Sequence, residues 1–177
     1  MSPIPVYSFE VDKVDRKTSL LKNKSPNGAA GWPLFSIRTS SSKPHRTITR
    51  ADNPHHVIAT ISFHSLSSKI DITLHGQPLQ LKKNDMFSSG HSFHHPAAGE
   101  LKWKEAGFLS TGLVLVDSSG RELCKYKKRA FDVFVQVDHA FMDMILVTGL
   151  AAAEYKRQSD KAIGEAAGEA GAAVAGV

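Results

Sequence analysis

The chain has 177 residues, of which 41% are hydrophobic and 22% charged, and its formal net charge at pH 7 is +5. This length suits one folded domain with short tails, and the composition indicates a globular rather than a disordered chain. The excess of basic residues favours anionic partners. The single cysteine, Cys124, excludes an internal disulfide, and the first sixteen residues lack the apolar run of a secretory signal. An intracellular protein, cytoplasmic or peripheral at a membrane, is expected.

Most of the predicted elements are short β-strands. Residues 1–30 are expected to hold one strand at 6–11, in which Tyr7, Phe9 and Val11 share a face, and a turn-rich linker at 22–28. The folded body is expected over residues 31–160. Its first strands are separated by loops rich in Ser, Asn and Pro, and they are predicted at 34–38, 47–50, 57–64, 69–74 and 79–81.

The clearest turn signal is Asp-Ser-Ser-Gly at 117–120. It predicts a hairpin between strands at 113–116 and 121–128. The next segment, 131–137, alternates between apolar and polar residues and predicts a strand with one buried face. Phe134 breaks the alternation because it lies on the polar face, so it is expected to point outward.

A hydrophobic helix is predicted over about 138–160. From Ala140 to Ala153 the only charged residue is Asp143, so no solvent-facing side exists at helical spacing. The apolar run is too short to span a membrane, which predicts a buried helix with a β-protein wrapped around it. Its buried residues are expected to include Phe141, Ile145, Leu146 and Leu150.

The two ends of this helix carry polar signals. Asp138 is expected to cap the first turn, and Asp143 is expected near solvent, where its charge favours the helix dipole, rather than in a buried polar site. Lys156 and Arg157 are expected near the other end. The segment 161–177 is rich in Gly and Ala and is expected to be a flexible tail.

The order of these elements resembles an uncharacterised fungal domain family that is assigned to the tubby C-terminal-like superfamily. The matching segments lie roughly between Trp32 and Arg157, and they are Trp32–Phe35, Ile37–Arg38, Thr47–Arg50, Val57–Ile61, Leu101–Trp103, Leu115–Gly120 and Met142–Gly149. The resemblance implies a mainly β fold, an antiparallel closed or nearly closed β-barrel with the helix through its centre. Relatives of that fold are the tubby proteins, phospholipid scramblases and LURP-one-related proteins, which are linked mainly to membrane phospholipids. No position here matches the phosphoinositide-binding motif of tubby proteins, and the palmitoylated cysteine cluster of scramblases is missing.

Four lysines are the candidate anion-binding residues. Lys102 and Lys104 share the face opposite Trp103, and Lys125 and Lys127 share a face one hairpin later. On neighbouring strands these lysines would form a patch for phosphate groups. The alternative is a solvated exterior, where lysines discourage edge-to-edge pairing of strands.

Histidines and the cysteine raise the question of metal or catalytic chemistry. His91, His94 and His95 are predicted in one glycine-flanked loop, and His55 lies beside another histidine in a second loop. A structural zinc site needs four ligands and a catalytic one usually three, so surface histidines without a metal or cofactor are expected. Cys124 lies in a strand and is expected to be a small hydrophobic side chain rather than a nucleophile.

The chain contains no nucleophile elbow, phosphate-binding loop or zinc-protease motif. We therefore expect a non-enzymatic intracellular binding module that docks on anionic phospholipid surfaces, including phosphoinositides. The alternative is a protein-interaction or scaffold domain, with Phe134 as a candidate apolar contact. An enzyme that uses the histidine loop ranks third. Nucleic-acid binding ranks last, because the lysines lack interleaved exposed aromatic residues.

Overall fold

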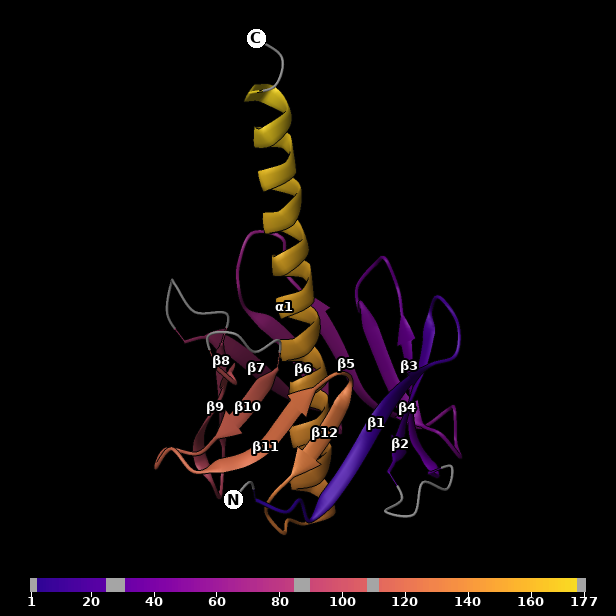
Figure 1. Cartoon of the computed structure of the whole chain (residues 1–177). Coiled ribbons are helices and arrows are strands. Elements are labelled where there is room, and N and C mark those ends of the chain that lie inside the picture. The colour runs from indigo at the N-terminus through magenta and orange to yellow at the C-terminus, as the bar shows by residue number, and fades with distance from the viewer. Residues whose placement is uncertain (1–2, 25–30, 85–89, 108–111, 175–177) are drawn as a thin grey trace.

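The computed structural model of the chain shows a closed antiparallel β-barrel with a long helix through it (Figure 1). It describes residues 3–24, 31–84, 90–107 and 112–174, with side chains to residue 165. The helix, α1, spans His139–Val174. Within the described ranges the barrel strands are β1 (Tyr7–Lys13), β2 (Thr18–Asn23), β3 (Pro33–Thr39), β4 (Arg46–Arg50), β5 (Val57–Phe63), β6 (Ile70–Leu74), β7 (Gln77–Lys83), β8 (His91–His95), β9 (Gly99–Glu105), β10 (Leu113–Val116), β11 (Glu122–Lys127) and β12 (Ala130–Val133).

The order of strands around the barrel follows the order along the chain, and β1 closes the sheet by pairing with β12. Closure leaves the sheet without a free edge. Because all neighbouring strands are antiparallel, the loops that follow even-numbered strands share one end of the barrel, where α1 also begins. We call this the entry end. The loops that follow odd-numbered strands lie at the exit end, from which α1 projects (Figure 1).

Alternation along the strands builds the core. On β3, Phe35 and Ile37 are buried, whereas Arg38 is exposed. On β9, Leu101 and Trp103 are buried in the same way. Inward side chains of this kind surround the helix, and each buried aliphatic or aromatic side chain contributes about 1.5–3 kcal/mol to folding. The predicted mainly β fold with a central helix is therefore confirmed.

Helix α1 is buried most deeply over its first half. Ile145, Leu146 and Leu150 are buried as predicted, whereas Phe141 is only partly buried because it lies at the entry end. Asp138 caps the helix as expected: its Oδ1 accepts the backbone N–H of Phe141 at 2.8 Å. Among the described residues, no helix combines the length and the apolar character needed to cross a bilayer.

The barrel begins earlier in the chain than the sequence suggested. Residues 7–23 form β1 and β2, so they are part of the barrel rather than of a segment that precedes it. Phe9, Val11 and Leu21 are buried, and their burial is what holds these strands in the sheet. Lys22 belongs to β2, and the rest of the predicted linker falls mostly outside the described residues.

Two further boundaries differ from the predictions. The strand predicted at 131–137 ends at Val133, and Val135 and Val137 pack partly buried against the core beyond its end. The helix extends to Val174 instead of giving way to a flexible tail after residue 160. Alanine, the best helix former, offsets the helix-weakening glycines in that segment.

Candidate anion-binding surface

The four predicted lysines lie on two strands that flank β10. Lys104 of β9 and Lys125 of β11 lie opposite the same residue of β10, Val114, from its two sides. Lys102 lies two residues nearer the entry end, and Lys127 lies at the exit-end terminus of β11. The structure thus brings Lys104 and Lys125 together across β10 and leaves the other two at the margins.

Carboxylates share this outer wall with the lysines. The Nζ atom of Lys102 lies 3.3 Å from Oε1 of Glu100, and Lys125 lies opposite Asp132 in the β11–β12 register. Oδ1 of Asp132 also accepts a hydrogen bond from Oγ of Ser8 at 2.7 Å. The outer wall therefore carries charges of both signs. Such a surface attracts an anion less strongly than a surface of unpaired cations does.

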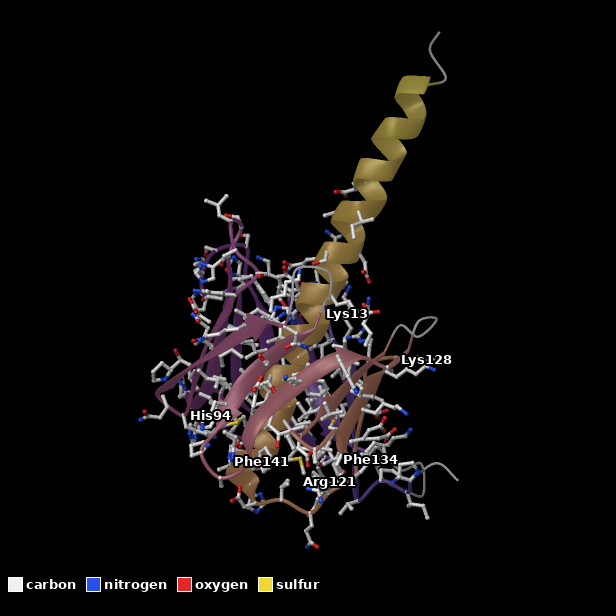
Figure 2. The ribbon with its side chains drawn as sticks, turned by 90° about the vertical axis from the view of Figure 1, so that its left-hand side faces the viewer. Lys13, His94, Arg121, Lys128, Phe134 and Phe141 are labelled. Atoms are coloured by element: carbon white, nitrogen blue, oxygen red, sulfur yellow. The ribbon has the colours of Figure 1, made fainter. Side chains whose placement is uncertain are left out.

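The exit end presents a more strongly basic surface on two neighbouring hairpins. The β1–β2 and β11–β12 hairpins are joined where the backbone N–H of Val11 donates to the carbonyl of Arg129 at 2.8 Å. Within the described parts of the chain, none of their six exposed basic side chains forms an ion pair. We call these residues the basic rim: Lys13, Arg16, Lys17, Lys127, Lys128 and Arg129. Figure 2 shows Lys13 and Lys128 at the exit end, with Arg121 at the opposite end.

Local geometry presents the rim residues at the tips of both hairpins. In the β1–β2 turn, Oδ1 of Asp15 accepts the N–H groups of Lys17 at 2.6 Å and Thr18 at 2.8 Å, and these hydrogen bonds lower the pKa of Asp15. In the β11–β12 turn, Lys128 and Arg129 have φ angles of 50° and 66°. Such two-residue turns prefer Asn-Gly, and a left-handed conformation costs other residues roughly 1–2 kcal/mol each. Strain at a loop tip is typical of functional positions.

Exposed apolar side chains lie at the same end. Val14 in the β1–β2 turn is 58% exposed, and Leu66 in the β5–β6 loop is 99% exposed. Ile163, on the projecting part of α1, is also exposed. Apolar tips beside basic residues are the combination by which peripheral proteins bind membrane interfaces.

Asp143 occupies a buried polar site at the entry end, so its expected position near solvent is wrong. Its Oδ2 atom lies 3.1 Å from Nη2 of Arg50 and 2.9 Å from Nε2 of His75. Asp143 lies about one turn into the helix, past its exposed first residues, and these partners from β4 and the β6–β7 turn enclose the carboxylate. The only sequence signal for this site was an acidic residue in an apolar helix. Its partners could not be identified from the sequence, because Arg50 lies 93 residues away and His75 lies 68 residues away.

The three neighbouring histidines lie on strand β8 rather than in a loop, which corrects the prediction. Alternation turns His91 inward, where it is buried with Nε2 2.8 Å from the carbonyl oxygen of Ser68. His95 stacks on Phe141 with ring centroids 4.3 Å apart, and His94 is exposed (Figure 2). Among the described residues, no three His, Cys, Asp or Glu side chains are grouped as metal ligands.

Cys124 and Phe134 are both less exposed than a reactive thiol or an apolar docking residue would be. Cys124 is fully buried, which confirms the expected small hydrophobic side chain; burial, with a contribution from the charge of Asp132, strongly raises the pKa of its thiol. Phe134 lies just beyond β12 and is half-buried, not fully exposed. Its backbone N–H donates to the carbonyl of Leu123 at 2.9 Å.

Comparison with known proteins gives a fold and a family. No curated protein matches the chain at a significant level. The structure is similar to the X-ray structure of a protein from Arabidopsis thaliana, with a TM-score of 0.53 and 14% sequence identity, over 82% of this chain and 90% of that chain. At this identity the likeness concerns the fold alone. The model of a family of unknown function, DUF6593, matches residues 16–159. Because the match extends from the β1–β2 turn through the enclosed part of α1, the chain belongs to the DUF6593 family.

Proposed function

We propose that this protein is a non-enzymatic intracellular module that docks on anionic phospholipid surfaces with its exit end. The observation that carries the proposal is the basic rim, in which two neighbouring hairpins present six exposed cations and no ion pair among the described residues. Two of these cations, Lys128 and Arg129, occupy turn positions that favour Asn and Gly. The hairpin is therefore less stable than one with Asn-Gly at these positions, as is common where residues serve a function.

The binding free energy expected from the basic rim suits reversible membrane binding. A basic residue near an acidic membrane surface contributes about 1 kcal/mol, so six residues supply several kcal/mol. Val14 and Leu66 add apolar contacts that depend little on salt. Because side chains of α1 fill the barrel, a ligand meets the outer wall and the loops rather than an interior pocket.

The resemblance to tubby-like proteins supports the same function by analogy. We include in the proposal a fungal origin and membership of the tubby C-terminal-like superfamily, whose members are linked mainly to membrane phospholipids. Lys127 belongs both to the lysines predicted from the sequence and to the basic rim. Lys102, Lys104 and Lys125 form a second candidate surface on the mixed outer wall.

Vesicle co-sedimentation at low and high salt tests the proposal. The full chain is expected to bind phosphatidylserine vesicles, to bind neutral vesicles weakly, and to lose affinity as salt increases. The double substitution Lys128→Asn with Arg129→Gly removes two rim charges and installs the preferred turn residues, so folding is retained. It should weaken binding about tenfold or more.

A matched control removes the same charge from the outer wall. Lys102→Gln with Lys104→Gln should leave vesicle binding nearly unchanged if the basic rim is the docking surface. Equal losses in both double variants would place binding on the whole basic surface instead. Binding that is indifferent to lipid charge would reject the proposal.

A second candidate function is protein interaction at the entry end. Exposed apolar side chains gather there at the starts of three strands: Trp32 is 86% exposed, and Val6 and Val57 are each 49% exposed. Exposed aromatic residues are common anchors of protein interfaces. If this surface carries the function, Trp32→Ser should abolish binding to an identified partner, whereas the double substitution in the basic rim should leave it unchanged.

A further inference from the structure

A second polar site lies at the exit end, in a cleft of about 280 Å³ between the β3–β4 and β5–β6 loops. The described residues that line it include one lysine, two histidines and two serines, but no carboxylate: Lys43, His45, Phe63, His64, Ser65, Leu66 and Ser67. Apart from Phe63 and Leu66, the lining side chains can donate hydrogen bonds, and Lys43 adds a positive charge with no carboxylate in the lining to balance it, so the cleft suits an anion.

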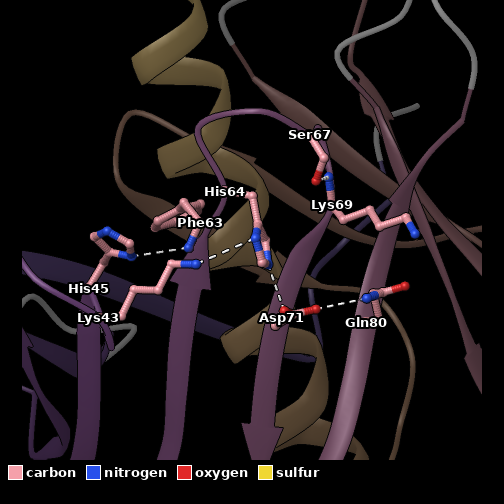
Figure 3. Close-up of polar contacts among 8 residues, drawn as sticks. All are labelled: Lys43, His45, Phe63, His64, Ser67, Lys69, Asp71 and Gln80. Atoms are coloured by element: carbon pink, nitrogen blue, oxygen red, sulfur yellow. Dashed lines mark hydrogen bonds and ion pairs between the residues drawn. The ribbon is translucent and has the colours of Figure 1, made fainter.

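His64 is held in one orientation by a hydrogen-bonded chain (Figure 3). Its Nε2 lies 2.6 Å from Oδ2 of Asp71, and Nε2 of Gln80 donates to Oδ1 of the same carboxylate at 2.8 Å. The hydrogen bond from Gln80, followed by that from His64, lowers the pKa of Asp71. The ionised carboxylate therefore accepts the Nε2 proton of His64 and leaves the other ring nitrogen, Nδ1, to face Lys43.

Lys43 supplies the positive charge of the cleft and lies beside His64. The Nζ atom of Lys43 lies 3.4 Å from Nδ1 of His64, at the outer limit of a hydrogen bond (Figure 3). With the ring proton on Nε2, Nδ1 of a neutral His64 accepts this hydrogen bond from the ammonium group. The ammonium group keeps two further N–H groups, which can donate to an anion in the cleft.

Further donors surround these two groups. Nδ1 of His45 accepts the backbone N–H of Phe63 at 3.1 Å, so the proton of a neutral His45 ring lies on Nε2. Among the described residues, the backbone N–H groups of Ser65, Leu66 and Ser67 find no acceptor. Consecutive free N–H groups in a loop can hold an anion with several oxygens.

From this geometry we propose that the cleft binds the phosphate group of a small soluble phosphomonoester. Such a group carries a charge of about −1.5 to −2 at neutral pH and three strong acceptor oxygens, which match the ammonium group of Lys43, the Nε2–H group of His45 and the loop N–H groups. The site shares no cation with the basic rim, because none of the six rim residues lines the cleft, whereas Leu66 belongs both to the cleft lining and to the apolar tips of the exit end. It does not require a membrane.

NMR titration of the full chain tests this site. Glycerol 3-phosphate, added to about 20 mM in a phosphate-free buffer, should give saturable shifts at the backbone amides of Lys43, His45 and residues 63–69. Lys43→Gln should weaken the affinity about tenfold, because it removes the charged donor. Lys69→Gln is the matched control, since Lys69 is exposed and does not line the cleft (Figure 3). This variant should bind as the unmodified chain does.

Three results would overturn the proposal: the absence of saturable shifts, equal weakening by both substitutions, or shifts confined to the basic rim. Phosphatidic acid vesicles distinguish a lipid source of the same phosphate group. Binding to these vesicles that Lys43→Gln weakens, without binding of the soluble ester, would assign the cleft to a lipid head group and reject our proposal. Phosphatidylserine binding measured on the same variant reports the basic rim, so the two proposals can fail separately.

Discussion

Gly149 determines how closely α1 approaches the barrel wall. A Cβ atom built on it would lie 2.5 Å from Cε1 of Phe131 and 2.9 Å from Cζ2 of Trp103. Both aromatic side chains are fully buried, and Nε1 of Trp103 donates to Oγ1 of Thr148 at 3.0 Å, so the rings have little room to move. Glycine in a helix interior costs about 1 kcal/mol relative to alanine, and the close approach to the rings explains its use here.

Gly149→Ala should therefore destabilise the protein despite the better helix propensity of alanine. Overpacking of a filled core costs about 1–3 kcal/mol, and urea denaturation measures the change in the free energy of unfolding. Gly164→Ala is the control, because a Cβ atom there meets nothing within 4 Å. The control should be neutral or stabilising, and an equal effect of both substitutions would contradict the close-approach argument.

The strand β4 holds α1 at two points. Nη2 of Arg46 lies 2.7 Å from Oε2 of Glu154, and Nη2 of Arg50, at the other end of the strand, pairs with Asp143. The two arginines are four positions apart, which spans about 13 Å of strand, and the two carboxylates are eleven positions apart, which spans about 16 Å of helix. The strand and the helix segment thus have similar lengths, and the two ion pairs fix how far the helix enters the barrel.

Glu154 should make the stability of the protein depend on pH. Burial acts to raise its pKa, but the hydrogen bond from Arg157, the charge of Arg46 and the hydrogen bond from Gln158 outweigh burial and lower it. A carboxylate with a lowered pKa contributes stability above its unfolded pKa of about 4.3, and this contribution is lost as the pH falls through the folded pKa.

Glu154→Gln should consequently be less stable than the unmodified protein at pH 7. The difference should shrink as the pH falls below the unfolded pKa of about 4.3 and disappear below the lowered pKa of the folded state. Urea unfolding of both proteins at several pH values from neutral to acid checks this. A stability difference that stays constant over the whole range would show that the ion pairs with Arg46 and Arg157 contribute nothing through charge.

Local patterns predicted much of the architecture. The Asp117–Gly120 turn, the apolar helix and the alternation of several strands each follow from neighbouring residues. Neighbouring residues did not predict that β1 belongs to the barrel, because this depends on pairing between Ser8 and Asp132, which are 124 residues apart. The basic rim was missed for the same reason: its residues at 13–17 and 127–129 become neighbours only when the barrel closes.

The whole fold depends on the apolar contact between the barrel and the helix, and Ile145 lies fully buried at its centre. Ile145→Asp places an unpaired charge in the core, so the variant should not fold cooperatively. Loss of the near-ultraviolet circular dichroism signal and of a cooperative urea transition would show this. Ile163→Asp, on the exposed projecting part of α1, is the control and should fold normally.

The position of α1 after the described strands of the barrel has a consequence for synthesis. When β1 leaves the ribosome, its partner β12 and the helix that fills the barrel lie more than 120 residues away, which is roughly ten seconds of translation at about 5–20 residues per second. During that interval the inward side chains, among them Phe35, Ile48 and Leu101, have no helix to cover them. The nascent chain must therefore be kept from aggregating until its last element emerges, and folding dominated by such distant contacts is slow.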